Sequence, residues 1–229
     1  MALSEPVAPP HARVVGRSRY SRRWFGGGTD GNEQLTAVAG VILLVLFAVL
    51  GVTIVFIGNN TMLWLHLFLG TLLVGPVALK LASTSYRFTR YYTSNLAYRR
   101  KGPPHPLMRV LGPFVILSTV GVFFTGLLLL LDGPGAGNLV RELHKLFFFA
   151  WLGVVAVHVL WHLRELPHGV LAVSRGEGGR RRNLPGSRGR GLVLLAAVAG
   201  GTVLALIFLP DIHTWTRGLA YHPFHLQIK

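Results

Sequence analysis

The chain contains no cysteine among its 229 residues, and only eight of its residues are acidic. The lack of cysteine excludes disulfides, thiolate metal sites, iron–sulfur clusters and covalently attached c-type haem. Charged residues make up 14% of the chain, compared with about a quarter in an average soluble domain. Any metal or cofactor chemistry must therefore use nitrogen or oxygen ligands.

Long apolar blocks take the place of the missing charge. Each block is close to the roughly 20 residues that a helix needs to cross about 30 Å of hydrocarbon. Isolated strands are excluded there, because unpaired backbone groups are too costly in lipid. The sequence thus predicts an all-α polytopic membrane protein with five transmembrane helices, over Leu35 to Ile57, Leu63 to Ser83, Val110 to Leu131, Leu143 to Leu163 and Gly191 to Leu209.

The apolar blocks also divide the chain into regions. Short polar segments at 58–62 and 132–139 require the first and second spans, and the third and fourth, to be antiparallel neighbours. The expected regions are a flexible basic arm at 1–34, a four-helix bundle at 35–165, a basic Gly/Arg-rich loop at 166–190, a fifth spanning helix at 191–209 and a tail at 210–229.

The formal charge of +15 has a marked asymmetry along the chain. Of the 23 basic residues, 18 fall on one side of the predicted membrane, four fall on the other, and Lys80 lies within a span. The positive-inside rule then predicts a multi-pass protein of the cell membrane with a cytoplasmic N-terminus and an extracytoplasmic C-terminus. Nucleic acid is not expected as a partner, because the basic residues are spread over three segments without a recognisable binding module.

Ionisable residues inside the spans are few, and their spacing is regular. His66 and Lys80 in the second span are 14 residues apart, as are His144 and His158 in the fourth. Fourteen residues advance a helix by about 21 Å and turn it through about 1400°, so each pair shares a helix face. Since the two spans run in the same direction, we expect His66 and His144 at one depth near the outer side. Lys80 and His158 should lie at another depth, toward the inner side.

Two neutral imidazoles at one depth of a helical bundle match the two axial positions of a haem iron. The third span runs the opposite way and contains Gly112 and Gly126, which are also 14 residues apart. This places Gly126 at the outer level and Gly112 at the inner one. Small residues leave room for a porphyrin, although glycine in membrane helices also serves close packing.

With these residues in place, the chain resembles the four-helix b-type cytochromes of membranes over residues 35–165. These include cytochrome b of quinol-oxidising complexes and the cytochrome b subunits of respiratory formate dehydrogenases and hydrogenases. The resemblance is one of spacing. It implies non-covalent haem b that carries electrons between the quinone pool and a redox partner, expected on the extracytoplasmic side, within a respiratory oxidoreductase.

The chain departs from the two-haem pattern at Lys80, where such a cytochrome has histidine. The resemblance therefore favours one haem, with His66 and His144 as its iron ligands, over two. A second haem on His158 and Lys80 stays open, as does pairing of Lys80 with a propionate, a quinone oxygen or a backbone carbonyl. His162 is either interfacial, a replacement ligand or part of a proton relay.

The tail contains His213, His222 and His225. Its only acidic residue is Asp211, so a surface for an extracytoplasmic partner, or an interfacial segment anchored by Trp215 and Phe224, is favoured over a metal site.

Two other function classes remain as alternatives. One is a haem-free scaffold or assembly protein whose histidines bridge helices, and the other is a small transporter using Lys80 and His158 for proton coupling. The transporter lacks an inverted-repeat signal. No span carries an acidic residue, and no nucleophile with a base is evident, so no hydrolytic or group-transfer centre is predicted. We expect a non-catalytic electron-transfer subunit.

Overall fold

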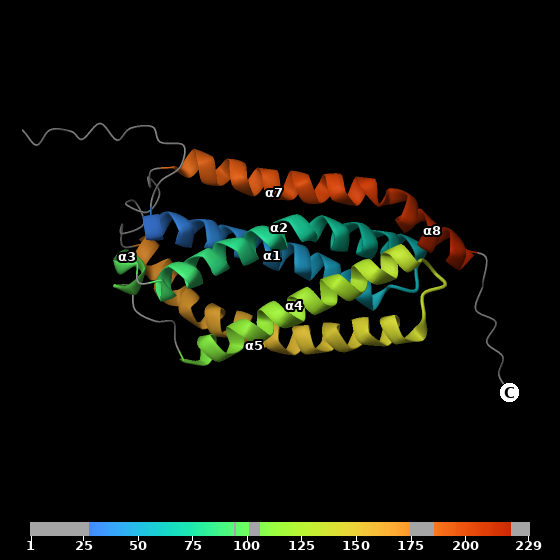
Figure 1. Cartoon of the computed structure of the whole chain (residues 1–229), viewed down its shortest axis with the longest axis horizontal. Helices are drawn as coiled ribbons and strands as arrows, with labels where there is room; N and C mark the ends of the chain where they lie inside the picture. The colour runs from blue at the N-terminus through green and yellow to red at the C-terminus, as the bar shows by residue number, and fades with distance from the viewer. Residues whose placement is uncertain (1–27, 94, 101–105, 175–185, 221–229) are drawn as a thin grey trace, which may run out of the picture.

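The computed structural model describes residues 28–93, 95–100, 106–174 and 186–220, with the side chains of 163–174 and 218–220 left aside (Figure 1). These residues form α1 (Gly28–Val55), α2 (Asn60–Tyr92), α3 (Leu96–Arg99), α4 (Pro106–Asp132), α5 (Asn138–Ser174), α7 (Ser187–Ile207) and α8 (Leu209–Ala220). Five of them, α1, α2, α4, α5 and α7, are long and apolar enough to cross a membrane. The prediction of an all-α polytopic membrane protein is confirmed.

The distribution of polar and apolar side chains is that of a protein in lipid. Large apolar side chains are exposed along the spans, with Val55 at 76% and Leu117 at 66% exposure. Exposing them to lipid tails has little cost, because the tails are equally apolar. The buried polar residues are hydroxyl residues, which return hydrogen bonds to their own helix: Thr53, Thr71, Ser83, Ser118, Thr119 and Thr125. The helices therefore present an apolar surface to a bilayer.

Two antiparallel hairpins are formed by α1 with α2 and by α4 with α5, as the short connections predict (Figure 1). Asn59 caps α2, because its side-chain oxygen accepts hydrogen bonds from the backbone of Thr61 at 2.8 Å and of Met62 at 3.4 Å. In the second hairpin, Gly133 has a φ of +74°, which suits glycine. The helices of each hairpin pack along their length, and α2 also contacts α4.

The fifth span packs on α2 through glycine. A Cβ atom on Gly201 would overlap the carbonyl of Leu72, and one on Gly75 would overlap the carbonyl of Ala197. The two backbones are therefore almost in contact. Figure 1 shows α7 on one side of the α1–α2 hairpin and the α4–α5 hairpin on the other, so that α2 is central.

The ends of the helices differ from the expected region boundaries. α1 begins at Gly28, inside the expected arm 1–34, and α5 continues to Ser174, inside the expected loop 166–190. The tail at 210–229 contains most of α8. These boundaries were placed where apolar residues end, but a helix can continue beyond the hydrocarbon until its backbone is capped or broken. Residues 1–27, 175–185 and 221–229 lie outside the described part.

The helix ends define two ends of the molecule. The arginine-rich end contains the start of α1, the end of α2, α3, and the starts of α4 and α7, with Arg87, Arg90, Arg99, Arg100, Arg109, Arg188 and Arg190. The opposite end contains both hairpin turns and α8, and we call it the α8 end (Figure 1).

Candidate functional site

His66 lies on α2 near the α8 end, where a buried threonine of α1 contacts its ring. Thr53 Oγ1 is 3.1 Å from His66 Nδ1 and donates its own proton to the carbonyl of Leu50 at 2.6 Å. A hydroxyl has one proton to donate, so Thr53 is left to accept from the imidazole. This favours the tautomer of His66 with hydrogen on Nδ1, and leaves the lone pair on Nε2 available.

His144 on α5 repeats this arrangement with a threonine of α4. Thr125 Oγ1 is 3.0 Å from His144 Nδ1, and it donates to the carbonyl of Gly121 at 2.7 Å. The hydroxyl therefore accepts from Nδ1–H here as well. Metal-ligating histidines commonly donate their second ring nitrogen in this way, which fixes the ring and raises its basicity as a ligand.

Gly126 follows Thr125 and lies against the His144 ring. A Cβ atom at position 126 would be 3.0 Å from His144 Cε1. The structure thus brings Gly126 to the level at which its spacing places it. The same construction at Gly112 finds nothing within 4 Å, so the structure does not bring Gly112 into contact with Lys80 or His158.

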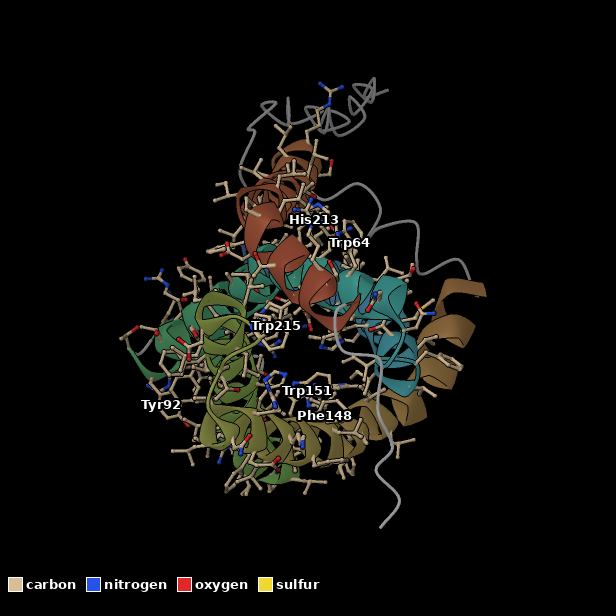
Figure 2. The ribbon with its side chains drawn as sticks, turned by 90° about the vertical axis from the view of Figure 1, so that its right-hand side faces the viewer. Trp64, Tyr92, Phe148, Trp151, His213 and Trp215 are labelled. Carbon is tan, nitrogen blue, oxygen red and sulfur yellow. The ribbon has the colours of Figure 1, made fainter. Side chains whose placement is uncertain are left out.

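The two imidazoles come from different hairpins, and both lie near the α8 end of the bundle. Further along the bundle, Phe47 of α1 contacts Trp151 of α5, with ring centroids 4.8 Å apart. Trp151 Nε1 donates to Thr119 Oγ1 at 3.1 Å. Figure 2 shows Trp151 and Phe148 projecting from α5 toward the middle of the bundle. These aromatic side chains lie between the histidine pair and the arginine-rich end.

At the α8 end, the indole of Trp215 on α8 contacts the last turns of α4. Its Nε1 donates to the carbonyls of Leu129 at 3.2 Å and Leu130 at 3.3 Å (Figure 2). The tail residue expected to anchor at the interface therefore anchors on the protein itself. His213 of α8 is exposed, and the predicted tail residues His222, His225 and Phe224 lie outside the described residues.

Lys80 lies on α2 toward the arginine-rich end. Its Nζ donates to the carbonyl of Thr36 on α1 at 2.7 Å, and a Cβ on Gly40 would be 3.1 Å from it. Thr36 Oγ1 also donates to Ser83 Oγ at 3.1 Å. Of the partners left open by the sequence, the structure gives Lys80 a backbone carbonyl. An ammonium that donates in this way has no lone pair to offer to iron.

His158 lies on α5 toward the arginine-rich end, as Lys80 does on α2. Its ring centroid is 4.6 Å from that of His162, at 72°. Its Nδ1 is buried, and no described residue forms a hydrogen bond with it. Lys80 and His158 lie toward the same end of the bundle, and their surroundings differ from those of His66 and His144.

A self-contained metal site is absent from the described residues, since no three of their His, Asp or Glu side chains come together. A haem iron has a smaller requirement, because the porphyrin supplies four nitrogens and the protein supplies at most two axial ligands. His66 and His144 therefore suit this cofactor by number and by ligand type.

The sequence reasoning missed Thr53 and Thr125. A signal was available, because antiparallel hairpins bring together residues that are equally far from the turn. This holds for Thr125 and His144, which are 10 and 9 residues from the middle of the second turn, but not for Thr53 and His66, which are 4.5 and 8.5 residues from the middle of the first. Comparison of the chain with protein-family models, with curated proteins and with solved structures finds no match.

Proposed function

We propose that the chain is a membrane b-type cytochrome that binds one non-covalent haem b through His66 and His144. In this proposal it carries electrons between the quinone pool and a redox partner, as a subunit of a respiratory oxidoreductase. One observation carries the proposal. Two histidines from different hairpins lie near the same end of the bundle, and a buried threonine accepts from Nδ1 of each.

The protonation pattern supports iron binding. A neutral imidazole donates from one nitrogen and accepts at the other, so a hydrogen on Nδ1 leaves Nε2 as the ligand atom. Thr53 and Thr125 fix the same choice on both rings.

The packing of α4 on α5 fixes the position of the His144 ring. Gly126 presents no side chain to His144, and Gly121 presents none to the ring of Phe147, so both rings lie close against α4. Phe47 and Trp151 meet between the hairpins and exclude water from the side facing the arginine-rich end. Bound haem iron supplies one-electron redox chemistry, and these residues would fix its ligands, its access to water and its dielectric environment.

The hydrogen bond of Lys80 favours one haem over two. Its Nζ is engaged with the carbonyl of Thr36, and His158 lacks a hydroxyl on its Nδ1. Neither residue has a threonine hydroxyl as its partner, as His66 and His144 do. The arginine-rich end is proposed as cytoplasmic from the positive-inside rule, which places α8 and a redox partner on the outer side.

A haem-free scaffold is the second candidate, and a specific observation favours it. Each histidine already bridges two helices through Nδ1, and this bridge needs no cofactor. The two candidates differ in one atom, because a scaffold uses Nδ1 alone whereas a cytochrome also needs Nε2.

Substitution of His66 by Asn separates these candidates. The Asn amide nitrogen takes the place of Nδ1 and can still donate to Thr53, but no atom replaces Nε2. We expect the wild-type protein, purified from haem-sufficient cells, to show a Soret band and one haem per chain by pyridine haemochrome, and His66→Asn to lose most of this haem. A colourless wild-type protein would favour the scaffold.

A further inference from the structure

A second site lies at the arginine-rich end, away from the histidine pair. A cavity of about 570 Å³ opens between the first turn of α1, the end of α2, α3 and the start of α7. The described residues that line it include two arginines and two tyrosines from three different helices: Arg90, Arg190, Tyr86 and Tyr98. Its volume is within the range of small-molecule sites.

Both arginines contact neighbouring side chains. The Arg90 guanidinium carbon is 5.9 Å from the centroid of Tyr86, and Tyr98 meets the same ring edge-on at 6.2 Å. The backbone of Asn95 donates to the carbonyl of Arg90 at 3.2 Å, which folds α3 back onto α2. Arg190 Nη2 donates to Gln34 Oε1 at 2.8 Å. Two guanidinium groups therefore line one cavity.

Two helix starts add to this positive field. Gly28 and Thr29 of the first turn of α1 line the cavity, as does Gly186, which precedes α7 and has no side-chain cap. The first turn of a helix leaves backbone N–H groups without intrahelical partners and has the positive end of the helix dipole. The described lining contains no carboxylate. Asp30 and Glu33 of α1 are near it in sequence but have partners of their own.

We propose that this cavity binds the phosphate of an anionic phospholipid. Guanidinium forks and free backbone N–H groups are the donors that a phosphate group prefers. Apolar side chains exposed further along the surrounding helices favour a lipid over a soluble phosphate. Val38 of α1, Phe88 of α2 and Leu192 of α7 are exposed and offer a surface for acyl chains. Positive residues at one membrane face are also where anionic lipids are attracted.

The test uses the purified, delipidated full-length protein in a neutral detergent. Phosphatidylglycerol is titrated and binding is followed by native mass spectrometry and by the thermal unfolding midpoint, with phosphatidylcholine as the neutral comparison. We expect saturable binding of phosphatidylglycerol and about tenfold weaker binding in Arg90→Gln, because one charge-assisted hydrogen bond is lost. Arg190→Gln should weaken binding similarly. If Arg190→Gln fails to fold, Arg90→Gln leaves the bond to Gln34 intact and still tests the site.

Arg109→Gln is the matched control, because Arg109 is exposed on α4 at the same end and does not line the cavity. Wild-type affinity in this variant supports a specific site. An equal loss in Arg109→Gln, or equal binding of phosphatidylcholine, would overturn the proposal. Inorganic phosphate that binds alone and displaces the lipid would assign the cavity to a soluble anion. The outcome is independent of haem content.

Discussion

The two ends of the bundle use the same residue spacing in different surroundings. On α2 and α5, a pair of ionisable residues 14 positions apart places one member near the α8 end and one near the arginine-rich end. Near the α8 end, a threonine accepts from each imidazole. Near the arginine-rich end, Lys80 donates to a backbone carbonyl and His158 Nδ1 has no described partner. Spacing sets the depth of a side chain, and the adjoining helix sets its chemistry.

The hairpin geometry gives the reason for this difference. The positions opposite His66 and His144 in the two hairpins are Thr53 and Thr125. In the register that pairs Thr53 with His66, the position opposite Lys80 is Ala39, and the neighbouring Gly40 has no side chain and so leaves room for the lysine to extend to Thr36. The position opposite His158 falls near Leu111, so no hydroxyl is available there.

The largest expected effect is the loss of haem when a histidine near the α8 end is replaced. A replacement of Lys80, toward the arginine-rich end, is the comparison. His144→Asn retains a donor toward Thr125 but lacks Nε2, so we expect it to lose most of the haem. Lys80→Met keeps the length of the side chain and removes the ammonium, and it should keep the wild-type haem content. Pyridine-haemochrome stoichiometry measures both. An equal loss of haem in Lys80→Met would show that the level of Lys80 also takes part in haem binding.

The threonines provide the next test of the comparison. Thr53→Val and Thr125→Val keep the side-chain shape and remove the acceptor for Nδ1–H, so each should weaken haem retention about tenfold and shift the midpoint potential of the iron. Thr71→Val is the control, because Thr71 is also buried on α2 and bonds the carbonyl of Leu67. Haem titration and potentiometry report the change. The same shift in Thr71→Val would mean that the effect arises from helix packing alone.

The glycines of α4 test the same contrast on a smaller scale. Gly126→Ala would place a methyl group 3.0 Å from His144 Cε1, and a ring held by Thr125 has little freedom to move. Overpacking of this size costs about 1 kcal/mol, or about fivefold in haem affinity. Gly112→Ala meets nothing within 4 Å and should keep the wild-type affinity. If both variants bind haem like the wild type, the ring is not confined as the structure indicates.

The order and number of the spans can be predicted from the sequence, because lipid tolerates few charges and the apolar blocks are uninterrupted. The sequence is not sufficient for the helix ends, since α2 continues to Tyr92 through residues that no longer need to be apolar. The common depth of His66 and His144 follows from helix geometry alone. The packing of α7 on α2 cannot be predicted in this way. Gly75 and Gly201 indicate that a helix approaches closely, but the sequence does not identify which helix it is.

The smallest expected effect concerns His158, where the two levels should respond with opposite signs. A buried polar atom without a partner is unfavourable, so His158→Phe should raise the free energy of unfolding by about 1 kcal/mol. His144→Phe should lower it, because Thr125 loses its partner. Thermal unfolding in detergent measures both, with haem content recorded in parallel. A loss of stability or haem in His158→Phe would mean that its Nδ1 has a ligand in the membrane, and the levels would then be alike.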